Sequence, residues 1–230
     1  MAIRTSSSLS DIPKEAVVVD ENDAINHQWE TIKSWPKLAE VWPFRIGIPL
    51  LGAAGTIGGL VINTHFRRKL SLYSYGKLAT TVAMGMAPAV MIAGSHAIFV
   101  THDLYLNKTQ CLVCLQQKAI LLQLTFGLGY PLTLSPLANF MYATRHGTYR
   151  LPYWGDYKGT IKLWWKWIVS AREKFLLLIL FHAFTAAFLT YKEKESLLNV
   201  QQKLLTVEAE YLEELKSRGK GGSPGGGTPQ

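Results

Sequence analysis

The sequence predicts an all-α, multi-pass membrane protein: a helical bundle with four transmembrane helices and amphipathic flanking helices. The chain has 230 residues, of which 48% are hydrophobic and 17% are charged, whereas soluble domains carry about a quarter charged residues. The hydrophobic residues are gathered into four blocks, and residues 46–191 contain only three acidic side chains. A soluble fold would have too little polar surface to cover four such blocks.

The composition excludes several other classes of protein. The chain has 10 prolines, 19 glycines in no triplet pattern and 2 cysteines, which is unlike a disordered, a collagen-like or a disulfide-rich secreted chain. The net charge of +8 is a property of many nucleic-acid-binding proteins. Here the basic residues flank apolar blocks, so we expect membrane topology and no nucleic-acid partner.

We expect the membrane domain to occupy residues 45–191. At about 1.5 Å per helical residue, each apolar block is long enough to cross a hydrocarbon core. Pro131 and Pro136 are expected to kink the third block, since membrane helices tolerate proline where neighbouring helices satisfy the freed carbonyls. The four predicted spans are residues 46–62, 78–100, 119–142 and 175–191.

Small residues recur at four-residue spacing in the first two spans. Gly55 and Gly59 share one helical face of the first span, and such spacing allows the backbones of two membrane helices to approach closely. Glycine and alanine are also common in spans that make no such contact. The second span carries the same pattern in Ala79, Ala83 and Ala87.

The basic residues predict the orientation of the chain in the membrane. The loops after the first and third spans together hold 11 Lys and Arg residues, whereas the loop between the second and third spans holds 2. The positive-inside rule places the first and third loops on the cytoplasmic or matrix side. Both termini and the middle loop are then on the opposite side.

Two flanking segments are rich in aromatic residues. Residues 1–44 form an N-terminal tail with an interfacial amphipathic segment, since Ile25, Trp29 and Ile32 share a helical face. Residues 157–174 combine tryptophans with lysines, which is typical of an aromatic belt or of a lipid headgroup site. The candidate contacts to lipid or to a partner are Arg67, Arg68, Trp164, Trp165 and Trp167.

Residues 192–220 predict an amphipathic helix that continues the fourth span, and residues 221–230 a flexible tail. Leucines at seven-residue spacing give this helix one apolar stripe, which can bind a partner helix or fold back on the protein's own membrane surface. The stripe residues are Leu198, Leu205, Leu212 and Leu215.

The sequence contains few groups that carry chemistry. Cys111 and Cys114 form a CxxC motif before the third span, which can be a structural disulfide, a reduced structural pair or the centre of a membrane thiol oxidoreductase. Such oxidoreductases usually need a second dithiol, and zinc would need two further ligands. Proton-coupled transport requires charged residues within the membrane. The four apolar blocks contain none. We therefore expect no catalytic residue, no metal site and no cofactor.

Several short motifs, in order along the chain, resemble those of the transmembrane protein 126 family. The CxxC motif of Cys111 and Cys114 is similar to that of one branch of the family, which is linked to early membrane-arm modules of respiratory complex I. The link between Pro152 and Lys158 is longer than in the family. The other matching motifs are Asn63-Thr-His-Phe66-Arg67-Arg68, Gly129-Tyr130-Pro131, Asn139, Ala143-Thr-Arg145-His146, and Leu151-Pro152 followed by Lys158-Gly159 and Trp164.

This resemblance implies a mitochondrial inner-membrane protein that helps to assemble respiratory complex I, the NADH dehydrogenase, without catalysis. The implied partners are complex I membrane-arm subunits, other assembly factors and inner-membrane lipids. The implied topology has the loops after spans one and three in the matrix and the termini in the intermembrane space. Two alternatives stay open: an accessory subunit of a respiratory complex, and a membrane thiol oxidoreductase that uses Cys111 and Cys114.

Overall fold

The computed structural model describes residues 19–109, 111–152 and 155–220, and within these ranges every regular element is a helix. Two of the elements are short π-helical turns, η2 and η3, which continue the α-helices before them. The elements are α1 (Glu21–Ser34), α2 (Leu38–Lys69), α3 (Lys77–His96), η2 (Ala97–Thr101), α4 (His102–Tyr105), α5 (Leu112–Leu124), η3 (Thr125–Gly129), α6 (Tyr130–His146), α7 (Tyr157–Val169) and α8 (Arg172–Lys220).

Within the described residues, four continuous helical segments are long and apolar enough to cross a membrane, which confirms the predicted fold class. They are α2, the run Lys77–Tyr105, the run Leu112–His146 and α8. Each is longer than the apolar block that predicted it, because the helices continue into polar residues at both ends of the block. Span four and the amphipathic C-terminal segment are thus parts of one helix, α8.

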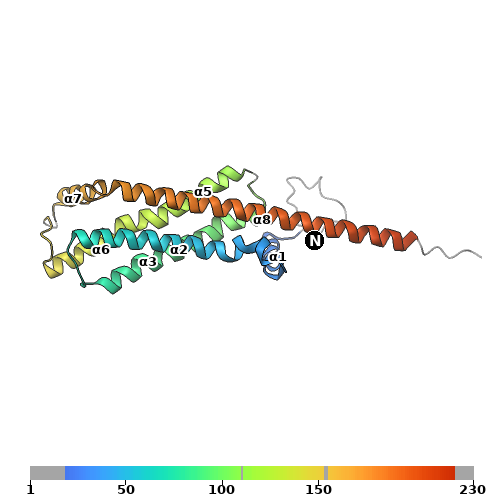
Figure 1. Ribbon diagram of the computed structural model, residues 1–230, viewed down its shortest axis with the longest axis horizontal. Coiled ribbons are helices and arrows are strands. Elements are labelled where there is room, and N and C mark those ends of the chain that lie inside the picture. The colour runs from blue at the N-terminus through green and yellow to red at the C-terminus, as the bar shows by residue number, and fades with distance from the viewer. Residues whose placement is uncertain (1–18, 110, 153–154, 221–230) are drawn as a thin grey trace, which may run out of the picture.

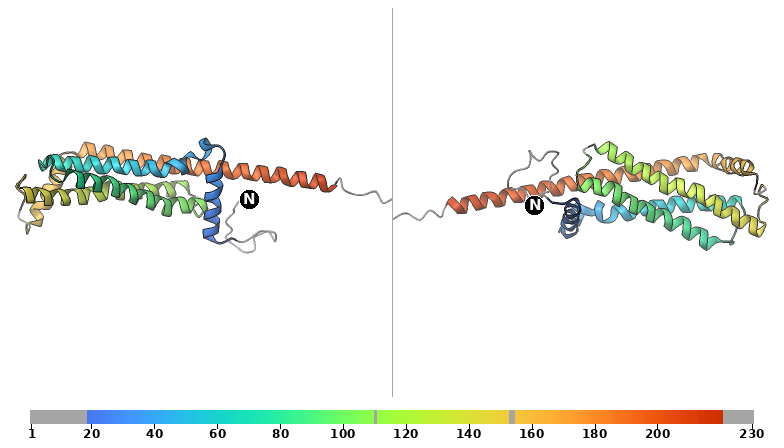
Figure 2. Two further views of the ribbon diagram at one scale, coloured as in Figure 1. Left: turned by 90° about the horizontal axis from the view of Figure 1, so that it is seen from below. Right: turned by 180° about the vertical axis from the view of Figure 1, so that it is seen from behind.

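The four long segments lie side by side, and the shorter helices lie at the two ends of the bundle (Figure 1). Helix α1 lies across one end of the bundle, and α7 lies at the other end (Figure 2). Helix α8 extends well beyond the α1 end. Two hydrophobic clusters fill the bundle, one between α1 and the adjoining halves of the spans and one beside α7.

Helices α2 and α3 pack closely because α2 presents glycines to α3. A side chain at Gly59 would overlap the carbonyl oxygen of Met84, and one at Gly55 would overlap Ile92. The glycine spacing seen in the sequence therefore marks a real helix contact. The alanine spacing does not: Ala79 and Ala83 are exposed on the outer face of α3.

The third span, in which we predict a kink, contains a π-helical turn just before its first proline. The π-helical turn η3 ends at Gly129, two residues before Pro131, and both Pro131 and Pro136 are buried. Local π-helical adjustment is one way in which a membrane helix accommodates the missing proline N–H.

The outer surface of the bundle is apolar, as a lipid-facing surface must be. Large hydrophobic side chains are exposed along all four spans, among them Leu50, Val90, Leu121 and Leu177.

Candidate functional site

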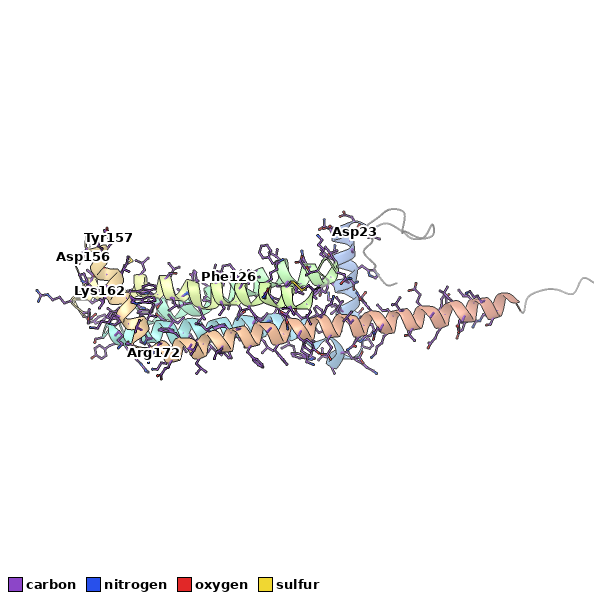
Figure 3. All side chains as sticks on the ribbon, turned by 90° about the horizontal axis from the view of Figure 1, so that it is seen from above. Asp23, Phe126, Asp156, Tyr157, Lys162 and Arg172 are labelled. Carbon is purple, nitrogen blue, oxygen red and sulfur yellow. A yellow bond between two sulfur atoms is a disulfide. The ribbon has the colours of Figure 1, made fainter. Side chains whose placement is uncertain are left out.

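The two basic loops meet at one end of the bundle, which we call the basic end (residues 67–77, 145–152 and 155–174). The rings of Tyr75 and His146, from the first and third loops, stack with centroids 4.1 Å apart. Figure 3 shows Lys162 and Arg172 at this end and Asp23 at the other. The loops that the charge pattern assigned to one side therefore do share one side of the molecule.

Arg67 organises the loop between α2 and α3. It is only 8% exposed, and its guanidinium donates to the carbonyls of Tyr73 (2.8 Å) and Tyr75 (2.9 Å) and to the hydroxyl of Thr80 (2.9 Å). Arg68, the next residue, is exposed. Of the two predicted contact arginines, the first thus has an internal role and the second is free to bind.

A buried polar cluster lies one turn deeper and joins three spans. The amide oxygen of Asn63 on α2 accepts hydrogen bonds from Asn139 (2.9 Å) and Ser135 (3.2 Å) on α6. Its amide nitrogen lies 3.4 Å from the hydroxyl of Thr80 on α3. Sequence reasoning placed Asn63 and Asn139 in motifs but gave no reason to pair them.

The three tryptophans of α7 have different surroundings. Trp167 is buried against Phe66 and Phe140, and the indole N–H of Trp164 donates to the Leu132 carbonyl on α6 (3.1 Å). Trp165 is 59% exposed. Two of the tryptophans therefore hold α7 against the bundle, and the third faces outward, as an aromatic belt requires.

At the opposite end, the apolar residues of α8 divide into two sets. Leu197 and Val200 are buried in the cluster that includes α1 and the start of α2, and the Lys203 ammonium lies 2.6 Å from the Glu40 carboxylate. The second set, between 39% and 50% exposed, is made up of Leu198, Leu205, Leu212 and Leu215, the residues predicted as the partner stripe.

Cys111 and Cys114 form a disulfide at the start of α5, with Cα atoms 5.4 Å apart. The Cys111 sulfur also accepts from the Cys114 N–H as the N-cap of the helix. The chain has no other cysteine, so a redox cycle would need an external dithiol. Among the described residues, no group of three or more His, Cys, Asp or Glu is arranged to hold a metal ion.

Two histidines bind other helices inside the bundle. His96 on α3 lies 3.0 Å from the Glu193 carboxylate on α8, and His182 on α8 lies 3.1 Å from Gln123 on α5. Gln123 also donates to the Leu51 carbonyl on α2 (3.2 Å). Sequence reasoning missed the His96–Glu193 pair because Glu193 follows the last apolar block. Helical spacing could have indicated that Glu193 is buried, because it lies on the same face of α8 as His182 and Leu189.

The family model described as Transmembrane protein 126 matches residues 23–206, which include all four spans and most of α1 and α8. The chain belongs to the transmembrane protein 126 family. A Drosophila melanogaster protein named Transmembrane protein 126 is 32% identical over 206 residues, which are 89% of this chain and 92% of the relative. The Transmembrane protein 126A proteins of rat and mouse are 27% and 28% identical over 110 residues, 48% of this chain and 56% of each relative. No solved structure matches the chain.

Two of the motifs that resemble the family contact each other in space, and a third binds α6. Asn63 and Arg67 belong to the motif after span one, and they bind Asn139 and the α2–α3 loop. Trp164 binds a carbonyl of α6. In this member of the family, these motif residues therefore hold the basic end together.

Proposed function

We propose that this protein is an assembly factor of the mitochondrial inner membrane that scaffolds membrane-arm intermediates of respiratory complex I by protein–protein contacts, without catalysis. Membership of the transmembrane protein 126 family supports the proposal, together with the resemblance of its motifs. The partners we propose are membrane-arm subunits and other assembly factors.

The observation that carries the proposal is the exposed apolar stripe of α8. Helix α8 passes the end of the bundle and continues as a single helix, with no other helix of the described residues beside it (Figure 1). Leu212 and Leu215 lie on this projecting part and are half exposed. An isolated helix with an apolar stripe gains stability by laying that stripe on another protein.

The proposed topology places the basic end in the matrix and the α1 end in the intermembrane space. The gathering of both basic loops at one end supports this orientation. The disulfide at the opposite end is consistent with it, because disulfides persist in oxidising compartments.

The test is deletion of the gene followed by rescue. Deletion should stall complex I as subassemblies on native gels, and the native chain should restore the mature complex. The variant Leu212→Glu/Leu215→Glu should express and insert but fail to rescue. Its matched control is Thr206→Glu/Ser217→Glu, which adds the same charge to the opposite face of α8 and should rescue. Normal complex I after deletion, or rescue by the stripe variant, would contradict the proposal.

The same gels separate an assembly factor from an accessory subunit of a respiratory complex. An assembly factor should migrate with the intermediates and be absent from the mature complex. Co-migration with the mature complex would favour the accessory subunit.

A further inference from the structure

A cavity of about 300 Å³ opens at the basic end between the end of α2 and the start of α3. Every side chain that lines it carries a cation or a hydroxyl group. The cations are Arg67, Arg68 and Lys77, and the hydroxyls come from Thr64, Ser71, Tyr73 and Thr81. Basic and hydroxyl donors without an acidic neighbour are the groups that bind phosphate oxygens.

The cavity is shaped by a loop that is held in place. Ser71 and Tyr73, which line it, adopt positive φ angles of 51° and 41°, a conformation that non-glycine residues keep only where their surroundings enforce it. The hydrogen bond from Arg67 to the Tyr73 carbonyl stabilises this conformation of the loop. Leu70 and Leu72 anchor the loop, since both are fully buried.

The other two cations that line the cavity have no acidic partner in the described part of the chain. Among the described residues, the ion pairs include neither Arg68 nor Lys77. Both side chains are exposed, and they come from different helices. An anion between them would therefore be held from two sides.

Exposed apolar side chains lead from the cavity toward the middle of the bundle. Val61 and Ile57 lie on α2, about one and two turns before the cavity residue Thr64. Leu78 and Val82 follow the cavity residues Lys77 and Thr81 on α3. A ligand with a charged head and an apolar tail matches this arrangement, whereas free phosphate would use only the head site.

We propose that this cavity is a binding site for an anionic phospholipid. The phosphate lies between Arg68 and Lys77, the hydroxyls of Thr64 and Ser71 donate to its oxygens, and the acyl chains follow the apolar face of α2 and α3. Basic pockets between membrane helices bind anionic headgroups in this way. The site does not depend on the proposed role in complex I assembly.

The test measures lipid binding to the full-length protein by native mass spectrometry. Purified protein is titrated with dioleoylphosphatidylglycerol, with dioleoylphosphatidylcholine and with inorganic phosphate. We expect saturable binding of phosphatidylglycerol, at least about tenfold tighter than of phosphatidylcholine, as two charge-assisted contacts imply. Equal affinity for the two lipids, or binding of inorganic phosphate as tight as that of phosphatidylglycerol, would overturn the proposal.

Charge variants locate the site. Arg68→Gln/Lys77→Gln should weaken phosphatidylglycerol binding about tenfold or more. Lys69→Gln/Lys174→Gln removes the same charge from exposed positions that do not line the cavity, and it should retain native affinity. An equal loss of phosphatidylglycerol affinity in both variants would show that the lipid is attracted to the basic end as a whole. That result would overturn the proposed site.

A second variant, Lys77→Glu, tests the site in case Arg68→Gln/Lys77→Gln fails to fold. Lys77 is the first residue of α3, where an acidic side chain is favourable to the helix. Lys77→Glu should therefore fold as the native protein does, with an unchanged circular dichroism spectrum, and should lose the lipid. Native lipid affinity in this variant would overturn the proposal.

Discussion

The Nε2 atom of His96 lies 3.0 Å from the carboxylate of Glu193, across the contact between α3 and α8. Both side chains are almost fully buried. The pair therefore joins the second span to α8 just after the fourth apolar block, where α8 is still inside the bundle.

We predict that Glu193→Ala lowers the free energy of unfolding by about 3–5 kcal/mol, because it leaves His96 buried without its partner. Reversible unfolding in mixed detergent micelles measures this. The double variant His96→Leu/Glu193→Leu should recover much of the loss, since apolar side chains can replace a buried pair. Glu208→Ala, on the exposed part of α8, is the control and should change stability by less than about 0.5 kcal/mol. If the double variant loses as much stability as the single variants His96→Leu and Glu193→Leu lose together, the two residues act independently.

Two glycines provide a paired test of the α2–α3 contact. Gly59→Ala should cost about 3 kcal/mol, because the new methyl group overlaps the Met84 carbonyl and separates the helices. Gly94→Ala places a methyl group in open space, so helix propensity should stabilise that variant by up to about 1 kcal/mol. The same unfolding assay measures both. Equal effects would mean that α2 and α3 are not packed as described.

The buried polar cluster gives a third prediction. Asn139→Leu removes a donor to Asn63, and we expect a loss of about 1–2 kcal/mol in unfolding free energy. The control is Thr133→Ala on the same helix, because the exposed Thr133 hydroxyl bonds only carbonyls of its own helix. A loss in Asn139→Leu no larger than in this control would show that the cluster does not hold the spans together.

The disulfide gives a prediction that bears on function. Maleimide should label neither cysteine of the purified native protein before reduction and both afterwards, as counted by mass spectrometry. We expect Cys111→Ser/Cys114→Ser to rescue complex I assembly in deletion cells, because a scaffold needs the disulfide only for local structure. Loss of rescue, together with a mixed disulfide trapped by Cys114→Ser, would instead favour the thiol oxidoreductase.

The spans and the clustering of the basic loops could be predicted because each depends on local composition. Uncharged blocks of sufficient length predict spans, and the sides on which lysines and arginines fall predict how the loops group. The contacts inside the bundle depend on helix rotation, which composition does not specify. Asn63 and Asn139 are separated by 76 positions, and nothing in either segment indicates that the two side chains meet.

The roles of individual candidate residues were harder to predict for the same reason. Arg67 and Arg68 are equivalent in the sequence, but they differ by about 100° around the helix axis. One therefore faces the loop and the other faces the outside. The same rotation separates Trp165 from Trp164, and it separates Leu198 from the buried Leu197.

Helix α8 has no break between the fourth span and its far end, so the two parts move together as one rigid helix. Glu193, inside the bundle, and Leu212, on the projecting part, are joined by about 28 Å of continuous helix. A protein that binds the projecting part of α8 therefore sets the tilt of the fourth span. Conversely, a shift of that span within the bilayer moves the projecting part. Mechanical displacement on one side of the membrane is thereby transmitted to the other without a hinge.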